Sequence, residues 1–460
     1  MEHVRSIGPM VAQESMRRLS DLLFSRTQEA NQMHTVLAGA AHTPFSRIRR
    51  DYPHILSAAK PILIATPATL AALTAPEPIA DVAIIDAGAH MPSIELLTIV
   101  SRARNVVVLA HRRTVTSPAL SKLIGMLPSV TVASRPSRRA PKLTAFLETH
   151  GYGDVRHDVA RAQGKLRYHY VEAAGVPVMT TGLVESSQQE IEEVVRLIAQ
   201  RAAGFAIVPA GYTLTVVSLT ETFRVRLGAE LKALAARDKS MGQFLRHVRI
   251  VSIVEVAGAQ ATDVILAVSY AKTTHGRLLQ QFGPLENENG QRLLLDALAL
   301  ADRDVDITAA FRADEMDDER IHQTGPQLLK TMLRWAEHLD DGEPLQPVPA
   351  VAGNVLFDDL AERLRARGLN AAVNYGFDRG MRIPLVVGLK DKPFALAVLT
   401  DDVQFMSTQS TRERHRIIMQ DLISLGWSVM NVWSVAAFVN PDKEIDHIVA
   451  RISDIYREKR

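Results

Sequence analysis

The sequence contains no cysteine among its 460 residues. This absence excludes disulfides, thiolate-bound zinc, iron–sulfur clusters and a cysteine nucleophile. Aromatic residues are also scarce, at 5% of the chain, so we expect no evident platform on which nucleic-acid bases would stack. Neither sign of charge is in excess, since 53 Lys and Arg stand against 51 Asp and Glu. The overall charge therefore does not indicate a nucleic-acid-binding protein.

Long hydrophobic segments are missing as well. No stretch approaches the roughly 18 consecutive apolar residues of a membrane-spanning helix, and the first 30 residues lack the apolar core of a secretion signal. Apolar residues nevertheless make up 47% of the chain, and its length suffices for about three domains of roughly 100 to 200 residues each. We therefore predict a cytoplasmic, multi-domain globular protein that makes no membrane contact.

Short apolar runs alternate with helical stretches in two successive blocks. Residues 151–338 show this alternation between Leu166–Val171 and Val305–Ala310. Residues 1–150 contain four strand-sized runs, which are Pro61–Ala65, Val82–Ile85, Val106–Ala110 and Val130–Ala133. Such alternation is typical of parallel sheets covered by helices. The sequence thus predicts two parallel-sheet α/β domains.

The composition changes after the second block. Residues 339–353 are rich in proline and acidic residues, which extend and solvate the backbone, so we predict a linker there. Residues 354–460 again alternate helices with strands, and the predicted strands include Ile383–Gly388, Phe394–Leu399 and Ser428–Trp433. This pattern predicts a small third α/β domain.

Several strings resemble known motifs. The run ADVAIIDAGAH at residues 80–90 resembles the Walker B strand of superfamily 1 helicases, which ends in Asp-Glu-Ala-x-Gln. FGPL at residues 282–285 resembles the approach to helicase motif VI. RERHR at residues 412–416, LGW at 425–427 and VWS at 432–434 are similar to the C-terminal half of very-short-patch-repair-type nucleases.

These strings stand in the order found in large bacterial superfamily 1 helicases that carry such a nuclease at their C-terminal end. The resemblance implies two RecA-like helicase domains, residues 1–150 and 151–338, of which the first is incomplete. It further implies a restriction-endonuclease-like α/β domain at residues 354–460. A protein of this kind is expected to work on DNA or another nucleic acid.

The residues that would bind and hydrolyse ATP are absent. No G-x-x-x-x-G-K-[ST] string, whose backbone and lysine hold nucleotide phosphates, occurs in the chain. At the Walker B position Asp86 would hold Mg²⁺, but Ala87 stands where the family has the glutamate that activates water. At motif VI, Ala299 and Ala301 replace two arginines. We therefore predict a degenerate motor without ATP or Mg²⁺ as cofactors.

The nuclease carboxylates are absent too. Phosphodiester cleavage requires carboxylates that converge on Mg²⁺, and Pro384 and Leu399 stand where the resemblance places them. Because proline lacks a backbone donor, we expect the strand that contains Pro384 to lie at a sheet edge or to be bulged. Asp401 and Asp402 form a displaced metal site in one interpretation and ordinary turn residues in the other.

Positive charge is concentrated between residues 101 and 147, which hold nine Lys or Arg and no Asp or Glu. Two arginine pairs in this segment, near the positions of helicase motifs III and IV, are predicted to contact nucleic-acid phosphates. They are Arg112, Arg113, Arg138 and Arg139. The alternatives are a site for an acidic protein partner and a solubilising surface.

A second positive cluster, Arg412, Arg414 and Arg416, begins a predicted helix beside His415. In the family that it resembles, this region faces the DNA backbone. Equally, these side chains would form the exposed face of a helix that packs through its apolar residues.

Two functions remain open from the sequence. One is a non-catalytic scaffold or regulatory subunit that binds nucleic acid, with a protein partner as a further option. The other is the C-terminal subunit of a split ATP-dependent helicase–nuclease, whose phosphate-binding loop another chain supplies. Ala87, Ala299 and Ala301 argue against the second function, because a supplied loop would not restore the missing side chains.

Overall fold

The computed structural model describes most of the chain, and it divides into two compact units, Met1–Val130 and Thr131–Arg460. The described residues are 2–39, 43–86, 91–110, 117–130, 136–153, 155–256, 259–339, 341, 345–350, 355–378, 380–408 and 410–457. Among them, no helix is both long enough and apolar enough to cross a membrane. The two units are described separately below.

The first unit contains a two-stranded parallel sheet in which Ala80 pairs with Ala103 and Ile85 pairs with Val108. One face of this sheet packs on a small core that includes Ile85, Leu96 and Leu120. The elements are α1 (Glu2–Ser25), α2 (Thr27–Ala38), α3 (Phe45–Asp51), α4 (Pro53–Ala59), α5 (Pro67–Leu73), β1 (Ala80–Ile85), α6 (Ser93–Val100), β2 (Ala103–Val108) and α7 (Pro118–Met126). The predicted strands Val82–Ile85 and Val106–Ala110 correspond to β1 and β2.

Two other strands predicted in this unit are not observed. Pro61–Ala65 forms no strand, and Ile62 and Ile64 within it are 78% and 92% exposed. An apolar run becomes a strand only where a neighbouring strand accepts its backbone hydrogen bonds, and β1 pairs only with β2 among the described residues. Of the predicted strand Val130–Ala133, all but Val130 lies outside the described residues.

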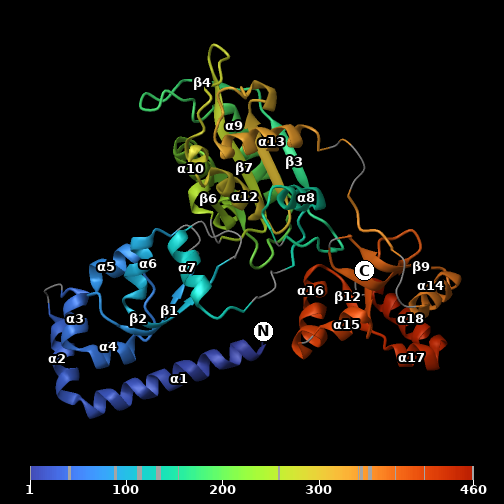
Figure 1. The fold of residues 1–460 in the computed structure, drawn as a ribbon, viewed down its shortest axis with the longest axis horizontal. Coiled ribbons are helices and arrows are strands. Elements are labelled where there is room, and N and C mark those ends of the chain that lie inside the picture. The colour runs from blue at the N-terminus through green and yellow to red at the C-terminus, as the bar shows by residue number, and fades with distance from the viewer. Residues whose placement is uncertain are drawn as a thin grey trace. The chain divides into compact units, whose positions relative to one another are not determined.

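The central domain of the second unit is built on a parallel sheet with the strand order β3-β8-β7-β5-β6, in which β4 also pairs with β7. Every residue of β5 and β8 is buried, because helices cover both faces of the sheet (Figure 1). The strands are β3 (Leu166–Tyr170), β4 (Ala174–Gly175), β5 (Leu214–Ser218), β6 (Val248–Ser252), β7 (Asp263–Thr273) and β8 (Val305–Ala310). The longer helices are α8 (Pro141–Thr149), α9 (Gln188–Ala203), α10 (Glu221–Arg237), α11 (Lys239–Phe244), α12 (Gly290–Ala299) and α13 (Thr324–Glu337).

Helix α8 lies in the core of the central domain, although the sequence placed it in a first domain that ends at residue 150. Leu143, Phe146 and Leu147 are buried in the core that also contains α12 and α13. The ring of Phe146 stacks on that of Trp335 from α13, with 4.3 Å between centroids. These contacts account for the division between Val130 and Thr131 rather than at residue 150.

The C-terminal domain contains a mixed sheet with the order β12-β11-β10-β9. Helices α14 and α18 cover one face, with Leu360 and Ile448 in the core, and α16 covers the other. The elements are α14 (Val355–Ala366), β9 (Leu369–Gly376), β10 (Arg382–Leu389), β11 (Leu396–Leu399), α15 (Val403–Ser407), a π-helical turn (Glu413–Ile417), α16 (Ile418–Ser424), β12 (Ser428–Asn431), α17 (Ser434–Val439) and α18 (Pro441–Arg457). The small third α/β domain is therefore present.

Residues far from this domain in the sequence complete its core. Val159 and Ala160 are buried among the residues that α16 covers, and the indole Nε1 of Trp427 donates to the Val159 carbonyl at 2.6 Å. In the predicted linker, Val348 exchanges two backbone hydrogen bonds with Gly376 at the outer edge of β9. Part of that segment is thus hydrogen-bonded to the sheet, while Val348 stays 50% exposed to solvent.

The expectation that the Pro384 strand lies at an edge or is bulged is wrong. Strand β10 lies inside the sheet, antiparallel to both β9 and β11, and its register with β9 is the same on both sides of Pro384. By this register Pro384 opposes Asn374, whose carbonyl accepts a hydrogen bond from Arg382 Nη1 at 2.7 Å. This side chain supplies a donor where proline has none, so the strand tolerates proline in an interior position.

Candidate functional site

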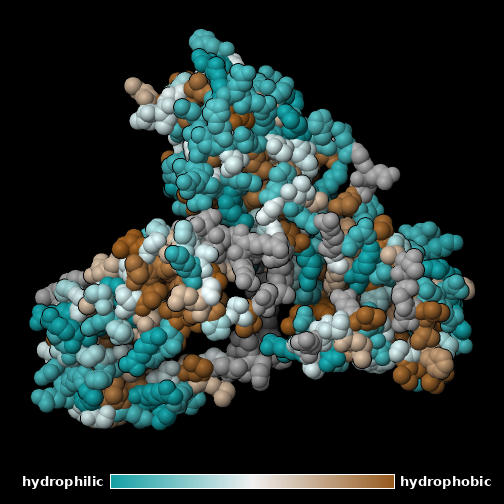
Figure 2. Space-filling view, in the orientation of Figure 1, coloured by the Kyte–Doolittle hydropathy of each residue, from teal (hydrophilic) through white to brown (hydrophobic). Residues whose placement is uncertain are grey.

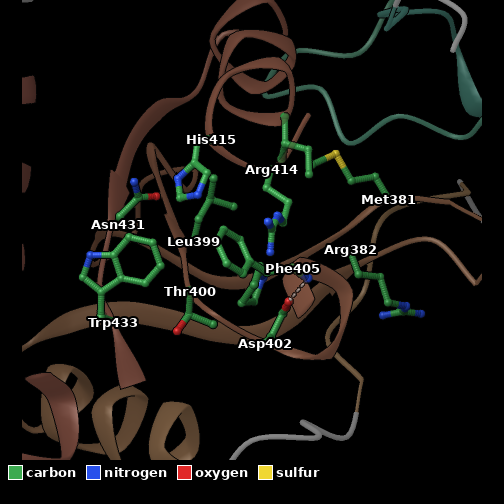
Figure 3. A pocket seen from close by; sticks show the side chains of 12 residues that line it. Met381, Arg382, Leu399, Thr400, Asp402, Phe405, Arg414, His415, Asn431 and Trp433 are labelled. Atoms are coloured by element: carbon green, nitrogen blue, oxygen red, sulfur yellow. Dashed lines mark hydrogen bonds between the residues drawn. The ribbon is translucent and has the colours of Figure 1, made fainter. Parts of the chain in front are cut away.

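One end of the C-terminal sheet carries a hollow of about 480 Å³, a volume that includes space open to solvent (Figure 3). The strands β10, β11 and β12 lead into it, and α15, the π-helical turn and the segment before α17 border it. The lining residues are Met381, Arg382, Pro384, Leu399, Thr400, Asp402, Phe405, Arg414, His415, Ile418, Asn431 and Trp433.

Pro384 and Leu399 both line this hollow, although they belong to different strands. They are the two positions at which the nuclease resemblance expects metal-binding carboxylates, and neither side chain offers an oxygen. Asp402 is the carboxylate among the lining residues, and its Oδ1 accepts the Phe405 backbone N–H at 2.8 Å at the start of α15. No group of three or more His, Asp or Glu side chains that would hold a metal occurs within the described residues.

Asp401 uses both carboxylate oxygens within the protein. Its Oδ1 accepts the backbone N–H of Ser434 at 2.7 Å and the Thr400 hydroxyl at 3.0 Å, and its Oδ2 accepts the Ser434 hydroxyl at 2.8 Å. Burial alone would raise the pKa of Asp401, but these hydrogen bonds outweigh burial and lower it. The carboxylate therefore holds the first residue of α17, and it belongs to no group of three or more potential metal ligands in the described part of the chain.

Three rings meet at the hollow, which the low aromatic content did not lead us to expect. Phe405 lies edge to face with both His415 and Trp433, with centroid distances of 5.2 and 5.6 Å. Trp433 is 40% exposed, so one aromatic surface remains open to solvent. Sequence reasoning missed this group because its members come from separate segments. His415 and Trp433 nevertheless belong to RERHR and VWS, two of the sequence motifs that resemble very-short-patch-repair-type nucleases.

Arg414 brings positive charge to the same rings (Figure 3). Its guanidinium lies 5.2 Å from the centroid of Phe405, within cation–π range. Its Nε is buried without a hydrogen-bond partner among the described residues, and Nη2 reaches the Thr411 hydroxyl only at 3.5 Å. Arg412 and Arg416, predicted with Arg414 to contact nucleic acid, are exposed on the same turn. Of the three arginines, Arg414 is the one that lines the hollow.

The guanidinium groups of Arg138 and Arg139 bind backbone carbonyls inside the second unit. Arg138 donates to the carbonyl of Ser424, at the end of α16, from Nε at 3.2 Å and from Nη2 at 2.5 Å. Arg139 donates to the carbonyls of Ala299 and Ala301 at 2.7 and 3.2 Å, and burial lowers its pKa. The structure thus gives these two arginines an internal role where the sequence predicted phosphate contacts.

The remaining predicted residues lie in the first unit. Asp86, the Walker B remnant, directly follows β1 and is exposed. Arg112, Arg113 and Ala87 lie outside the described residues. Of these positions, only Asp86 is among the described residues, and the first unit is described by itself.

A comparison with protein-family models finds a match in this domain. Residues 357–452, which include every residue of the hollow, match the restriction-endonuclease-like family REase_MTES_1575. A solved structure described as the C-terminal domain of a possible DNA helicase from Lactobacillus plantarum WCFS1 is 15% identical, covering 37% of this chain and 86% of that chain, with a TM-score of 0.22. No curated protein matches the chain. The small α/β domain at residues 357–452 is therefore restriction-endonuclease-like.

Proposed function

We propose that this protein binds nucleic acid through its restriction-endonuclease-like domain and does not cleave it. The observation that carries the proposal is the composition of the hollow, where Pro384 and Leu399 replace carboxylates and Arg414 lies beside three rings. Metal-assisted hydrolysis needs converging carboxylates, whereas guanidinium groups and aromatic rings hold phosphates and bases. This composition supports binding and offers a single carboxylate, Asp402, where cleavage needs several that converge.

The contacts between the central and C-terminal domains support a scaffold or regulatory role. Arg138 binds the end of α16, whose other end adjoins the π-helical turn that carries Arg414. Arg156 pairs with Asp421 on the same helix at 3.5 Å. The element that positions the cluster Arg412, Arg414 and Arg416 is thus anchored in both domains. Nucleic acid bound there would be held in a fixed relation to the central domain.

The test combines binding and cleavage assays on the full chain. We expect the wild-type protein to retard DNA or RNA and to leave plasmid and linear DNA intact with Mg²⁺ or Mn²⁺. The variant R414Q should bind more weakly, because it loses a cation at the hollow, whereas the control R451Q changes an exposed arginine on α18 and should bind normally. Metal-dependent cleavage that D402A abolishes would contradict the proposal, as would a wild-type protein that binds no nucleic acid.

A specific feature favours a second candidate, a subunit completed by another chain. Parallel sheets are normally covered on both faces, and isolated two-stranded sheets are marginally stable. On the β1–β2 sheet, however, Ile84 and Val107 are 66% and 45% exposed, and Leu109, directly after β2, is 52% exposed. Figure 2 shows further hydrophobic surface over the part of this unit where Figure 1 labels α6. A chain that adds strands and a phosphate-binding loop would cover such a surface.

Affinity purification from the native host, with and without nuclease treatment, separates the two candidates. A stoichiometric protein partner that survives nuclease treatment and gives an ATP-hydrolysing complex would establish the split helicase–nuclease. Recovery that nuclease treatment abolishes would support direct association with nucleic acid. The exchange I84E should weaken only the protein complex, because it places a charge on the exposed sheet face.

A further inference from the structure

We propose that the hollow of the C-terminal domain holds one unstacked nucleotide, with its base against Trp433 and its phosphate at Arg414. This inference rests on the proposed function, and it names the part of the nucleic acid that the domain recognises. The hollow is open to solvent and is lined by the ends of three strands, the π-helical turn and the segment before α17, so one group of a larger ligand can enter it.

The walls of the hollow match the two parts of a nucleotide. Pro384 and Leu399 give it apolar surface, and Phe405 and Trp433 add rings. Every nucleobase has a flat π face that stacks on aromatic side chains without regard to sequence. Thr400 and Asn431 add a hydroxyl and an amide at the lining, which are groups that hydrogen-bond to base edges. This lining suits a base better than it suits a phosphate.

Arg414 supplies the complementary site for a phosphate. Figure 3 shows its side chain reaching into the hollow above Phe405. The buried Nε has no acceptor in the described structure, and a buried donor without an acceptor is unfavourable unless a ligand provides one. A phosphate oxygen is a strong acceptor for a guanidinium, so a bound nucleotide satisfies this group.

The arrangement selects unpaired nucleotides over intact duplex. Bases inside a duplex are stacked and paired, so their flat faces are unavailable to Trp433 unless a nucleotide leaves the stack. Single strands, frayed ends and flipped nucleotides present that face directly. We therefore expect the full chain to bind single strands more tightly than blunt duplexes of equal length.

The experiment compares a single-stranded oligonucleotide of roughly 10 nucleotides with an abasic strand of the same length, since binding sites for single strands span about 4 to 16 nucleotides. The abasic strand keeps every phosphate and lacks the bases. Wild-type protein should bind the base-bearing strand about 5- to 140-fold more tightly, which is the range expected for one base–aromatic stack. Base-bearing strands should also quench the fluorescence of Trp433, whereas abasic strands should not.

Three variants of the full chain make the inference specific to Trp433. W433A should lose the preference for bases, and W433F should keep most of it because a ring remains. The control F438A removes a phenyl ring that is 76% exposed on α17, the helix that directly follows Trp433, and should behave as wild type. A cooperative thermal unfolding transition like that of the wild type shows that the fold of each variant is intact. The variant R414Q tests the proposed phosphate contact, and it should weaken the binding of both the base-bearing and the abasic strand.

The possible outcomes separate this inference from the proposed function. If wild-type protein binds both strands equally, or if folded W433A keeps the preference for bases, the nucleotide site is overturned while nucleic-acid binding stands. If wild-type protein binds neither strand nor duplex, the proposed function itself fails. Parallel DNA and RNA strands identify the sugar that the site accepts.

Discussion

A buried glutamate in the central domain predicts an unusual dependence of stability on pH. Glu190, in the first turn of α9, is fully buried. Its Oε1 accepts the Ser269 backbone N–H at 3.2 Å and the Thr308 hydroxyl at 2.8 Å. Its Oε2 has no hydrogen-bond partner among the described residues. Burial raises the pKa of Glu190 from 4.5 to about 7, because these two donors only partly offset the loss of solvation of the anion.

The carboxyl group of Glu190 holds an irregular part of the sheet. Ser269 has a φ of 65°, and the register between β7 and β8 shifts between Ala267 and Ala271. A hydroxyl–hydroxyl contact of 3.0 Å links Ser269 to Ser218 at the end of β5. Ionisation of Glu190 therefore places a charge beside the carboxyl ends of neighbouring strands.

The size of the effect follows from the pKa difference. Below about pH 4.5 the carboxyl is protonated in both the folded and the unfolded chain, so it carries no penalty. Between about 4.5 and 7 the unfolded chain releases the proton and the folded chain keeps it, so the free energy of unfolding falls as pH rises. At 1.36 kcal/mol per pKa unit the total loss is about 3 kcal/mol.

The variant E190Q removes the charge and retains an oxygen that accepts both hydrogen bonds. Urea unfolding of wild type and E190Q, measured between about pH 5 and pH 8, should show E190Q gaining up to about 3 kcal/mol relative to wild type as pH rises. Other titrating groups occur in both proteins and cancel in the difference. The exposed Glu192 lies on the same helix, so E192Q serves as the control. A difference between E190Q and wild type that is constant with pH would refute the reasoning.

Three further predictions concern the sites. Without a phosphate-binding loop, the purified chain should not hydrolyse ATP, and Mg²⁺-dependent turnover near about 1 per second would contradict this. Removal of Arg412 and Arg416 together should lower the slope of log affinity against log salt by up to about 1.8 on duplex DNA, measured by fluorescence anisotropy, and an unchanged slope would exclude phosphate contacts. D401A should lower the free energy of unfolding by about 0.5 to 2 kcal/mol in urea titrations because α17 loses its cap, and equal stability would assign Asp401 another role.

The sequence predicted the elements whose residues are buried along their whole length. Leu214–Ser218 and Val305–Ala310 are short apolar runs between turns, and both are interior strands of the central sheet. In these runs the apolar residues favour a buried strand and the fold provides a buried position between other strands, so the sequence pattern is enough to predict the strand. At Pro61–Ala65 the same kind of run has no neighbouring strand among the described residues, which shows that hydrophobicity does not by itself supply a hydrogen-bond partner.

Contacts between distant segments were beyond sequence reasoning. Nothing near Val159 indicates that its carbonyl binds Trp427, because the two residues belong to different domains and meet only through tertiary packing. The same holds for Arg138, whose charge suggested phosphate and whose partner is the carbonyl of Ser424. Charge in a sequence reports the presence of a donor, whereas the acceptor that it meets depends on the fold.

Under the proposed function, the hollow of the C-terminal domain would lack the metal ligands of a nuclease and gain apolar surface in their place. Two carboxylates that converge without a cation repel each other and raise each other's pKa, so an empty nuclease site is electrostatically strained. Pro384 and Leu399 remove that repulsion and add apolar surface to the same wall. Arg414 then faces rings and apolar side chains rather than a bound cation that would repel it. If the hollow derives from a nuclease site, as the resemblance implies, the exchanges at Pro384 and Leu399 would both remove metal ligands and favour the base and phosphate that we propose.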